Sequence, residues 1–166
     1  MTKKSRPVSR FNNKLRVLAE DMLETMYEGD GIGLAAPQVG VLRRLFVMDL
    51  DDDEGPVVFV NPRIVASDGD QEGPEGCLSL PGLFGIVNRP LKVTVQAQDL
   101  DGQPFEMTVE GLAARCVCHE HDHLDGILFR RHSQIPLCPL EDLPETEETE
   151  LEEEIEEEAD SEGDSL

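Results

Sequence analysis

The sequence contains no run of about 18 apolar residues, the length at which a segment is interpreted as a membrane-spanning helix. No apolar segment follows the basic N-terminus "MTKKSRPVSRFNNKLR", so it lacks the pattern of a secretory signal. Its six basic residues before Glu20 are also typical of an organelle presequence, but a plain basic arm is the preferred interpretation. With no sign of export, the four cysteines favour thiol or metal chemistry over disulfide bonds.

Basic residues are missing from the C-terminal end of the chain. Residues 141–166 contain 15 acidic residues and no basic one, in a chain of formal net charge −22. Such a run repels itself and has few apolar residues to bury, which predicts a disordered tail. We place this tail at residues 137–166, after a folded domain of residues 1–136. Its negative charge argues against direct contact with nucleic acid or anionic lipid.

The hydrophobic pattern predicts helices near both ends of the folded domain. Asn12 or Asn13 can cap a helix that ends near Gly29. The other predicted elements are strands at 44–50 and 57–62, a hairpin at 91–111 and a helix at 112–124. This order predicts an α+β fold with mainly antiparallel sheets around the later helix.

The stretch "CVCHEHDH", residues 116–123, offers more possible metal ligands than one ion can hold. Because successive residues on an α-helix are about 100° apart, His119 and His123 share a face, whereas His121 lies roughly opposite. The H-E-x-x-H arrangement predicts that the two facing imidazoles bind a metal and that Glu120 is the general base.

A third ligand has several possible sources. A histidine six residues after His123, as in metzincins, is excluded because Phe129 occupies that position. Later glutamates occur only in the acidic tail, a poor place for a fixed ligand. Cys77 is the preferred candidate. Cys116 and Cys118 are rivals, although neighbouring helical positions would crowd one ion and Cys118 points away from the histidine face.

The glycine-rich loop "GDGIGLAAPQVG" formally fits the dinucleotide fingerprint, with Gly31, Gly33 and Ala36 at the required spacing. That fingerprint needs a strand before it and a helix after it, but here a helix precedes it and Pro37 interrupts the segment after it. A loop of small residues that also contains the side-chain amide of Gln38 is better suited to binding a peptide chain. It lets the backbone approach a bound chain closely and offers a hydrogen-bond donor.

Three blocks follow one another along the chain: "GIGLAAPQ", "EGCLS" and "HEHDHL". Together they resemble the three signature motifs of the peptide deformylases, and the resemblance covers residues 7–129. It implies a catalytic domain at 1–136 that removes the formyl group from the N-terminal formyl-methionine of nascent polypeptides and releases formate.

The resemblance implies a metal site of Cys77, His119 and His123, with water as the fourth ligand. The expected ion is Fe²⁺, with Zn²⁺ or Ni²⁺ as alternatives, because these ligand types do not by themselves choose between the metals.

The resemblance also assigns the catalytic groups. Metal-bound hydroxide would attack the formyl carbon, while Glu120 accepts the proton of the water and later gives one to the leaving amine. The side-chain amide of Gln38 and the backbone N–H of Leu78 would hold the developing oxyanion.

The implied substrates are N-formylmethionyl peptides, in the cell nascent chains at the ribosome. The peptide would hydrogen-bond the backbone near Gly33. Its methionine side chain would enter an apolar pocket made by Ile32, Leu78, Leu112, Cys116 and part of His119. We expect a monomer in the bacterial cytoplasm, with no direct contact with nucleic acid or membrane.

Four features differ from the usual family pattern. The chain begins close to the first helix, and the acidic run replaces a C-terminal helix. Cys118 occupies the usual position of a glutamine, and His121 that of a large apolar residue. None of these changes removes a ligand, the base or an oxyanion donor, so we expect an active enzyme.

Two other functions stay open at this point. The chain could be a different H-E-x-x-H metallopeptidase, which would cut internal peptide bonds without regard to a formyl group. It could also be a deformylase-like binding protein without activity, which displays the acidic tail to a basic partner.

Overall fold

The computed structural model describes residues 2–146 of the 166-residue chain. The larger part of the predicted acidic tail, residues 147–166, therefore lies outside the described residues. Two α-helices, seven strands and three short 3₁₀ helices make up the described part. None of its helices has the length and apolar character needed to cross a membrane.

The first helix, α1, spans Asn13–Glu28, as its sequence predicted. Asn12 caps it, because the Asn12 side chain accepts a hydrogen bond from the backbone N–H of Leu15 at 3.2 Å. Gly29 forms the C-cap. The buried positions recur every three or four residues, at Leu15, Ala19, Met22 and Met26. This spacing places one apolar stripe against the sheet.

Five strands form the main sheet in the order β1-β2-β3-β6-β7, with every pair antiparallel. They are β1 (Gly33–Ala35), β2 (Leu45–Met48), β3 (Val57–Asp68), β6 (Lys92–Gln98) and β7 (Pro104–Glu110). The predicted hairpin at 91–111 is confirmed as β6 and β7. Strand β3 runs six residues beyond the predicted strand, because pairing with β6 satisfies its backbone despite a polar sequence.

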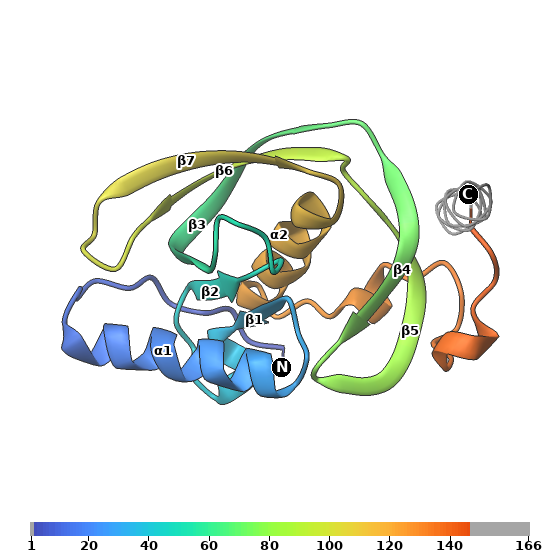
Figure 1. The fold of residues 1–166 in the computed structure, drawn as a ribbon, viewed down its shortest axis with the longest axis horizontal. Helices are drawn as coiled ribbons and strands as arrows, with labels where there is room; N and C mark the ends of the chain where they lie inside the picture. The colour runs from blue at the N-terminus through green and yellow to red at the C-terminus, as the bar shows by residue number, and fades with distance from the viewer. Residues whose placement is uncertain (1, 147–166) are drawn as a thin grey trace, which may run out of the picture.

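Helices pack on both faces of the main sheet, and β2 shows why. All four of its residues are buried, and alternate side chains point to opposite faces. Leu45 and Val47 join the core beneath α1, whereas Phe46 and Met48 join the core beneath the second helix. The part of the main sheet around β1 and β2 therefore lies between the two helices (Figure 1).

The second helix, α2, spans Gly111–Leu124 and ends before Gly126, where the positive φ of 73° suits glycine. The remaining two strands, β4 (Gln71–Cys77) and β5 (Leu80–Arg89), form a separate antiparallel hairpin. Figure 1 shows α2 between this hairpin and the main sheet. The predicted α+β class, with mainly antiparallel sheets and an N-terminal helix, is confirmed.

Segments at both ends of the described chain pack against this framework. The backbone N–H of Ser5 donates to the carbonyl of Leu124 at the end of α2, at 2.8 Å. Near the other end, Phe84 and Cys138 exchange two backbone hydrogen bonds of 2.8 and 3.0 Å. The segment before residue 139 thereby covers the outer edge of β5.

Candidate metal centre and active site

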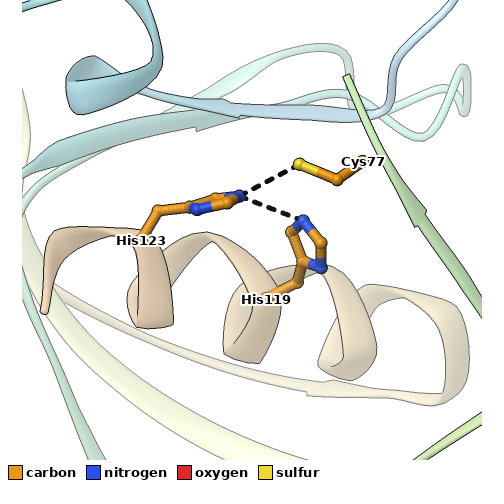
Figure 2. A group of neighbouring side chains, drawn as sticks. All are labelled: Cys77, His119 and His123. Carbon is orange, nitrogen blue, oxygen red and sulfur yellow. Dashed lines mark hydrogen bonds between the residues drawn. The ribbon is translucent and has the colours of Figure 1, made fainter. Parts of the chain in front are cut away.

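Three side chains from two separate elements meet at one point. His119 and His123 come from one face of α2, and Cys77 from the end of β4 (Figure 2). The two histidine Nε2 atoms are 3.1 Å apart, and Cys77 Sγ is 3.3 Å from His123 Nε2. Among the described residues this is the one group of three or more potential metal ligands, with ligand atoms within 4.8 Å of one another. We call it the ligand cluster.

The chemistry of the ligand cluster fits a metal ion. For bond lengths of ~2.0–2.3 Å, the ligands of a tetrahedral ion lie roughly 3.3–3.6 Å apart, close to the two spacings that involve His123. Burial, and then the nearby His119, lower the pKa of His123 to about 3. His123 therefore keeps a free lone pair at neutral pH, which a metal ligand requires.

The neighbouring candidates lie outside the ligand cluster. His121 faces another way, with its Nδ1 3.9 Å from Asp125 Oδ2, and burial lowers its pKa. Cys118 packs in the hydrophobic core between α2 and the main sheet. These positions follow from helical phase, because residues two apart on a helix point in nearly opposite directions.

Glu75, on β4, holds His119 in place. Its carboxylate accepts from His119 Nδ1 at 2.5 Å, which turns the Nε2 of that ring toward the ligand cluster. The same carboxylate accepts two hydrogen bonds from Arg89, at 2.7 and 3.1 Å, and one from Arg115 at 3.2 Å. Burial opposes ionisation of Glu75, but the hydrogen bonds from His119 and Arg89 outweigh it and lower the pKa to about 2.

This network joins the β4–β5 hairpin to α2. Arg89, on β5, also donates to Asp122 of α2 at 2.7 Å. The sequence motifs did not indicate either arginine of this network. Helical spacing could have indicated Arg115, which lies one turn before His119. No local pattern indicates Arg89, whose partners lie on other elements.

Glu120 is buried beside the ligand cluster, with 4% of its surface exposed. Its Oε2 has no hydrogen-bond partner among the described residues. Burial raises the pKa of Glu120 to about 7, although the nearby His119 opposes the shift. A carboxyl group of this kind can both accept and release a proton near neutral pH.

Gln38 reaches the ligand cluster from the 3₁₀ helix Ala36–Val39. Its Nε2 lies 3.5 Å from Cys77 Sγ, and its Oε1 accepts from the backbone N–H of Ala35 at 2.8 Å. Leu78 follows Cys77 directly, so its backbone N–H lies in the same turn. Two potential hydrogen-bond donors thus accompany the ligand cluster.

A pocket of about 650 Å³ opens above these groups. Of the ten residues predicted for the site, it is lined by all except His123, which lies deeper. The predicted residues on its wall are Ile32, Gly33, Gln38, Cys77, Leu78, Leu112, Cys116, His119 and Glu120. Phe84 and Pro81 of the hairpin add apolar surface that sequence reasoning did not predict.

Gly33 lies against the base of the pocket. A Cβ atom at this position would lie 2.7 Å from Glu120 Oε1 and 2.8 Å from Cys116 Sγ. Any larger residue would therefore displace one of these two side chains. Cys116 itself is 5% exposed, which suits a wall of the pocket.

Comparison with known proteins identifies the family of this chain. A family model described as polypeptide deformylase matches residues 1–135. A peptide deformylase of Clostridium perfringens is 49% identical over 132 residues, which cover 80% of this chain and 90% of that protein. A peptide deformylase of Lachnoclostridium phytofermentans is 52% identical over 130 residues, covering 78% and 80% of the two chains.

Solved structures show the same fold. A crystal structure of a peptide deformylase from Legionella pneumophila has a TM-score of 0.77 and 50% identity, over 79% of this chain and 78% of that one. A peptide deformylase from Synechococcus elongatus, in complex with actinonin, has a TM-score of 0.78 and 44% identity, over 80% and 74%.

The family match spans most of the chain, and these relatives are aligned over at least three quarters of it. The described fold and a ligand cluster suited to a metal-dependent hydrolase agree with them. The chain belongs to the polypeptide deformylase family, whose members are enzymes that remove formyl groups from nascent peptides.

Proposed function

We propose that Cys77, His119 and His123 hold the metal, and that Glu120, Gln38 and Leu78 carry out deformylation in the pocket above it. The observation that carries this proposal is that three ligand atoms meet beside the buried Glu120, whose Oε2 has no hydrogen-bond partner among the described residues. A divalent ion bound there would act as a Lewis acid and lower the pKa of a water molecule. Side chains and backbone groups of the protein carry out the proton transfers and bind the substrate.

Glu120 acts first as the general base and then as the general acid of the reaction. It accepts a proton from the attacking water and delivers one to the nitrogen that leaves as the free amine, so that formate and amine are the products. Its burial serves this role, because a desolvated carboxylate binds a proton more readily. Gln38 Nε2 and the backbone N–H of Leu78 donate to the formyl oxygen as it becomes negatively charged.

The peptide substrate lies along the Gly33 side of the pocket. Ile32, Leu112 and Cys116 surround the methionine side chain. The missing side chain at Gly33 leaves room for Glu120 and Cys116 to approach the backbone of that residue. We propose that these substrates are formylated nascent chains at the ribosome and that the enzyme acts as a monomer in the bacterial cytoplasm. The relatives named above come from bacteria, which supports this setting.

Formylated and acetylated peptides distinguish this activity from that of a general metallopeptidase. We expect formyl-Met-Ala-Ser to release formate at least about 10²-fold faster than acetyl-Met-Ala-Ser releases acetate, because the acetyl methyl group crowds the reacting carbon. The measurement is the product release rate at matched peptide concentration. Comparable rates on both peptides, or cleavage of internal bonds, would exclude the proposed function.

We propose Fe²⁺ as the native ion, on the basis of the family resemblance. One thiolate and two imidazoles also suit Zn²⁺, so the ligands do not decide the matter. Protein purified without oxygen should contain about one iron per chain, and its activity should fall when zinc replaces the iron. Metal analysis before and after exposure to air tests this. Full activity with zinc as the sole bound metal would contradict it.

A further inference from the structure

The orientation of the Gln38 amide is set by its surroundings. The backbone N–H of Ala35 can only donate a hydrogen bond, and it lies 2.8 Å from Gln38 Oε1. The amide oxygen must therefore face Ala35, and the Nε2 group must face the ligand cluster. One hydrogen bond to the oxygen still allows the amide plane to turn, because the terminal torsion of glutamine is soft.

Ser79 supplies a second contact to this amide. Its hydroxyl oxygen accepts from Gln38 Nε2 at 3.0 Å, while the same Nε2 lies 3.5 Å from Cys77 Sγ. The side chain of Gln38 is thus held at both ends, by Ala35 at the oxygen and by Ser79 at the nitrogen. An Nε2 group carries two hydrogens, so one remains directed toward the ligand cluster.

Ser79 is not part of the pocket wall and is exposed to solvent. Its contacts with the site are to protein groups alone: Gln38 through the hydroxyl, and Cys77 Sγ, which is 3.4 Å from the backbone N–H of Ser79. Any influence of the Ser79 hydroxyl on the reaction must therefore pass through Gln38.

We propose that Ser79 is a positioning residue for deformylation. Its hydroxyl binds one N–H of Gln38, so that the other N–H points to the oxygen that becomes negatively charged. This inference rests on the proposed role of Gln38 as an oxyanion donor. A donor aligned in advance stabilises the transition state more than one that must turn during the reaction.

Replacement of Ser79 tests the proposal on the metal-loaded enzyme with formyl-Met-Ala-Ser. Ser79→Ala should lower kcat about tenfold and change KM less than about twofold, because the contact acts on charge that develops in the transition state. Ser79→Thr keeps the hydroxyl and should keep most of the activity. Ser67→Ala, which removes an exposed serine hydroxyl on β3, is the matched control and should leave kcat unchanged.

A double-mutant cycle with Gln38→Ala separates positioning from a general structural effect. In the Gln38→Ala background, Ser79→Ala should cause no further loss, because the group that Ser79 positions is gone. A readout independent of turnover is the nuclear magnetic resonance signal of the Gln38 side-chain amide in metal-free protein. That signal should move in Ser79→Ala and stay in place in Ser67→Ala.

The outcomes that would overturn the proposal differ from those that would overturn the proposed function. If Gln38→Ala lost activity but Ser79→Ala did not, or if the Ser79→Ala loss were equal in both backgrounds, the positioning role alone would be wrong. If Gln38→Ala kept full activity, the donor role would be wrong and the positioning role with it. Metal content and melting temperature should match the wild type in Ser79→Ala throughout.

Discussion

Glu120→Gln should keep its metal and lose turnover by about 10²–10⁴-fold, the usual contribution of a general acid or base. Glutamine has nearly the shape of glutamate but cannot accept the proton of the attacking water. The ligand cluster does not include Glu120, so metal content should stay at the wild-type level. The melting temperature should not fall either, because the change removes a buried carboxylate whose Oε2 has no partner among the described residues.

The measurements are kcat with formyl-Met-Ala-Ser, metal content and thermal unfolding of the same preparation. Glu24→Gln, on the exposed side of α1, makes the same chemical change far from the ligand cluster and should have wild-type values for all three. If Glu120→Gln lost its metal together with its activity, Glu120 would be a ligand or a support for one. If it kept most of its turnover, another group would be the base.

Replacement of single histidines on α2 should show, through the change in metal affinity, which of them bind the metal. His119→Ala should weaken metal binding by more than about 10²-fold, because loss of even an outer hydrogen-bond partner typically costs about 10–100-fold. This change also takes away the hydrogen bond that Glu75 accepts, which leaves that carboxylate with Arg89 and Arg115. Activity should fall in parallel with metal content.

His121→Ala provides the matched control, since it removes the same side chain two residues away on the same helix. Its Nδ1 faces Asp125 rather than the ligand cluster, so metal affinity should stay within about twofold of the wild type. Titration of metal-free protein with Zn²⁺ and a competing chelator gives both affinities. Equal losses of metal affinity in His119→Ala and His121→Ala would contradict the assignment of His119, and not His121, to the metal-facing side of α2.

Local spacing was enough to predict the elements that carry the site. The apolar repeat and capping asparagine predicted α1, alternation predicted the hairpin at 91–111, and the i, i+4 histidines predicted the metal-facing side of α2. These patterns are reliable because each depends on residues within a few turns of one another. Resemblance to a known family then added the partners that come from distant parts of the chain.

Spacing could not show how β4 meets α2. Cys77 lies next to His123 because a separate hairpin folds against the helix, and the buried contacts of Glu75 with Arg115 and His119 of the helix hold it there. Buried charged residues of this kind leave no repeating pattern in the sequence, because each is stabilised by partners from other elements. The role of Ser79 was hidden for the same reason, since it depends on a contact with a residue 41 positions earlier.

The contact between Ser5 and Leu124 also affects how this protein folds. Synthesis proceeds from the N-terminus, so the first ordered residues are made long before the end of α2, to which they hydrogen-bond. They cannot take their final place until the chain is complete beyond residue 124. Closing so long a loop is slow, and folds dominated by such distant contacts form late and slowly. An enzyme that works on the first residue of other new chains therefore completes its own structure only after 124 of its own 166 residues have been made.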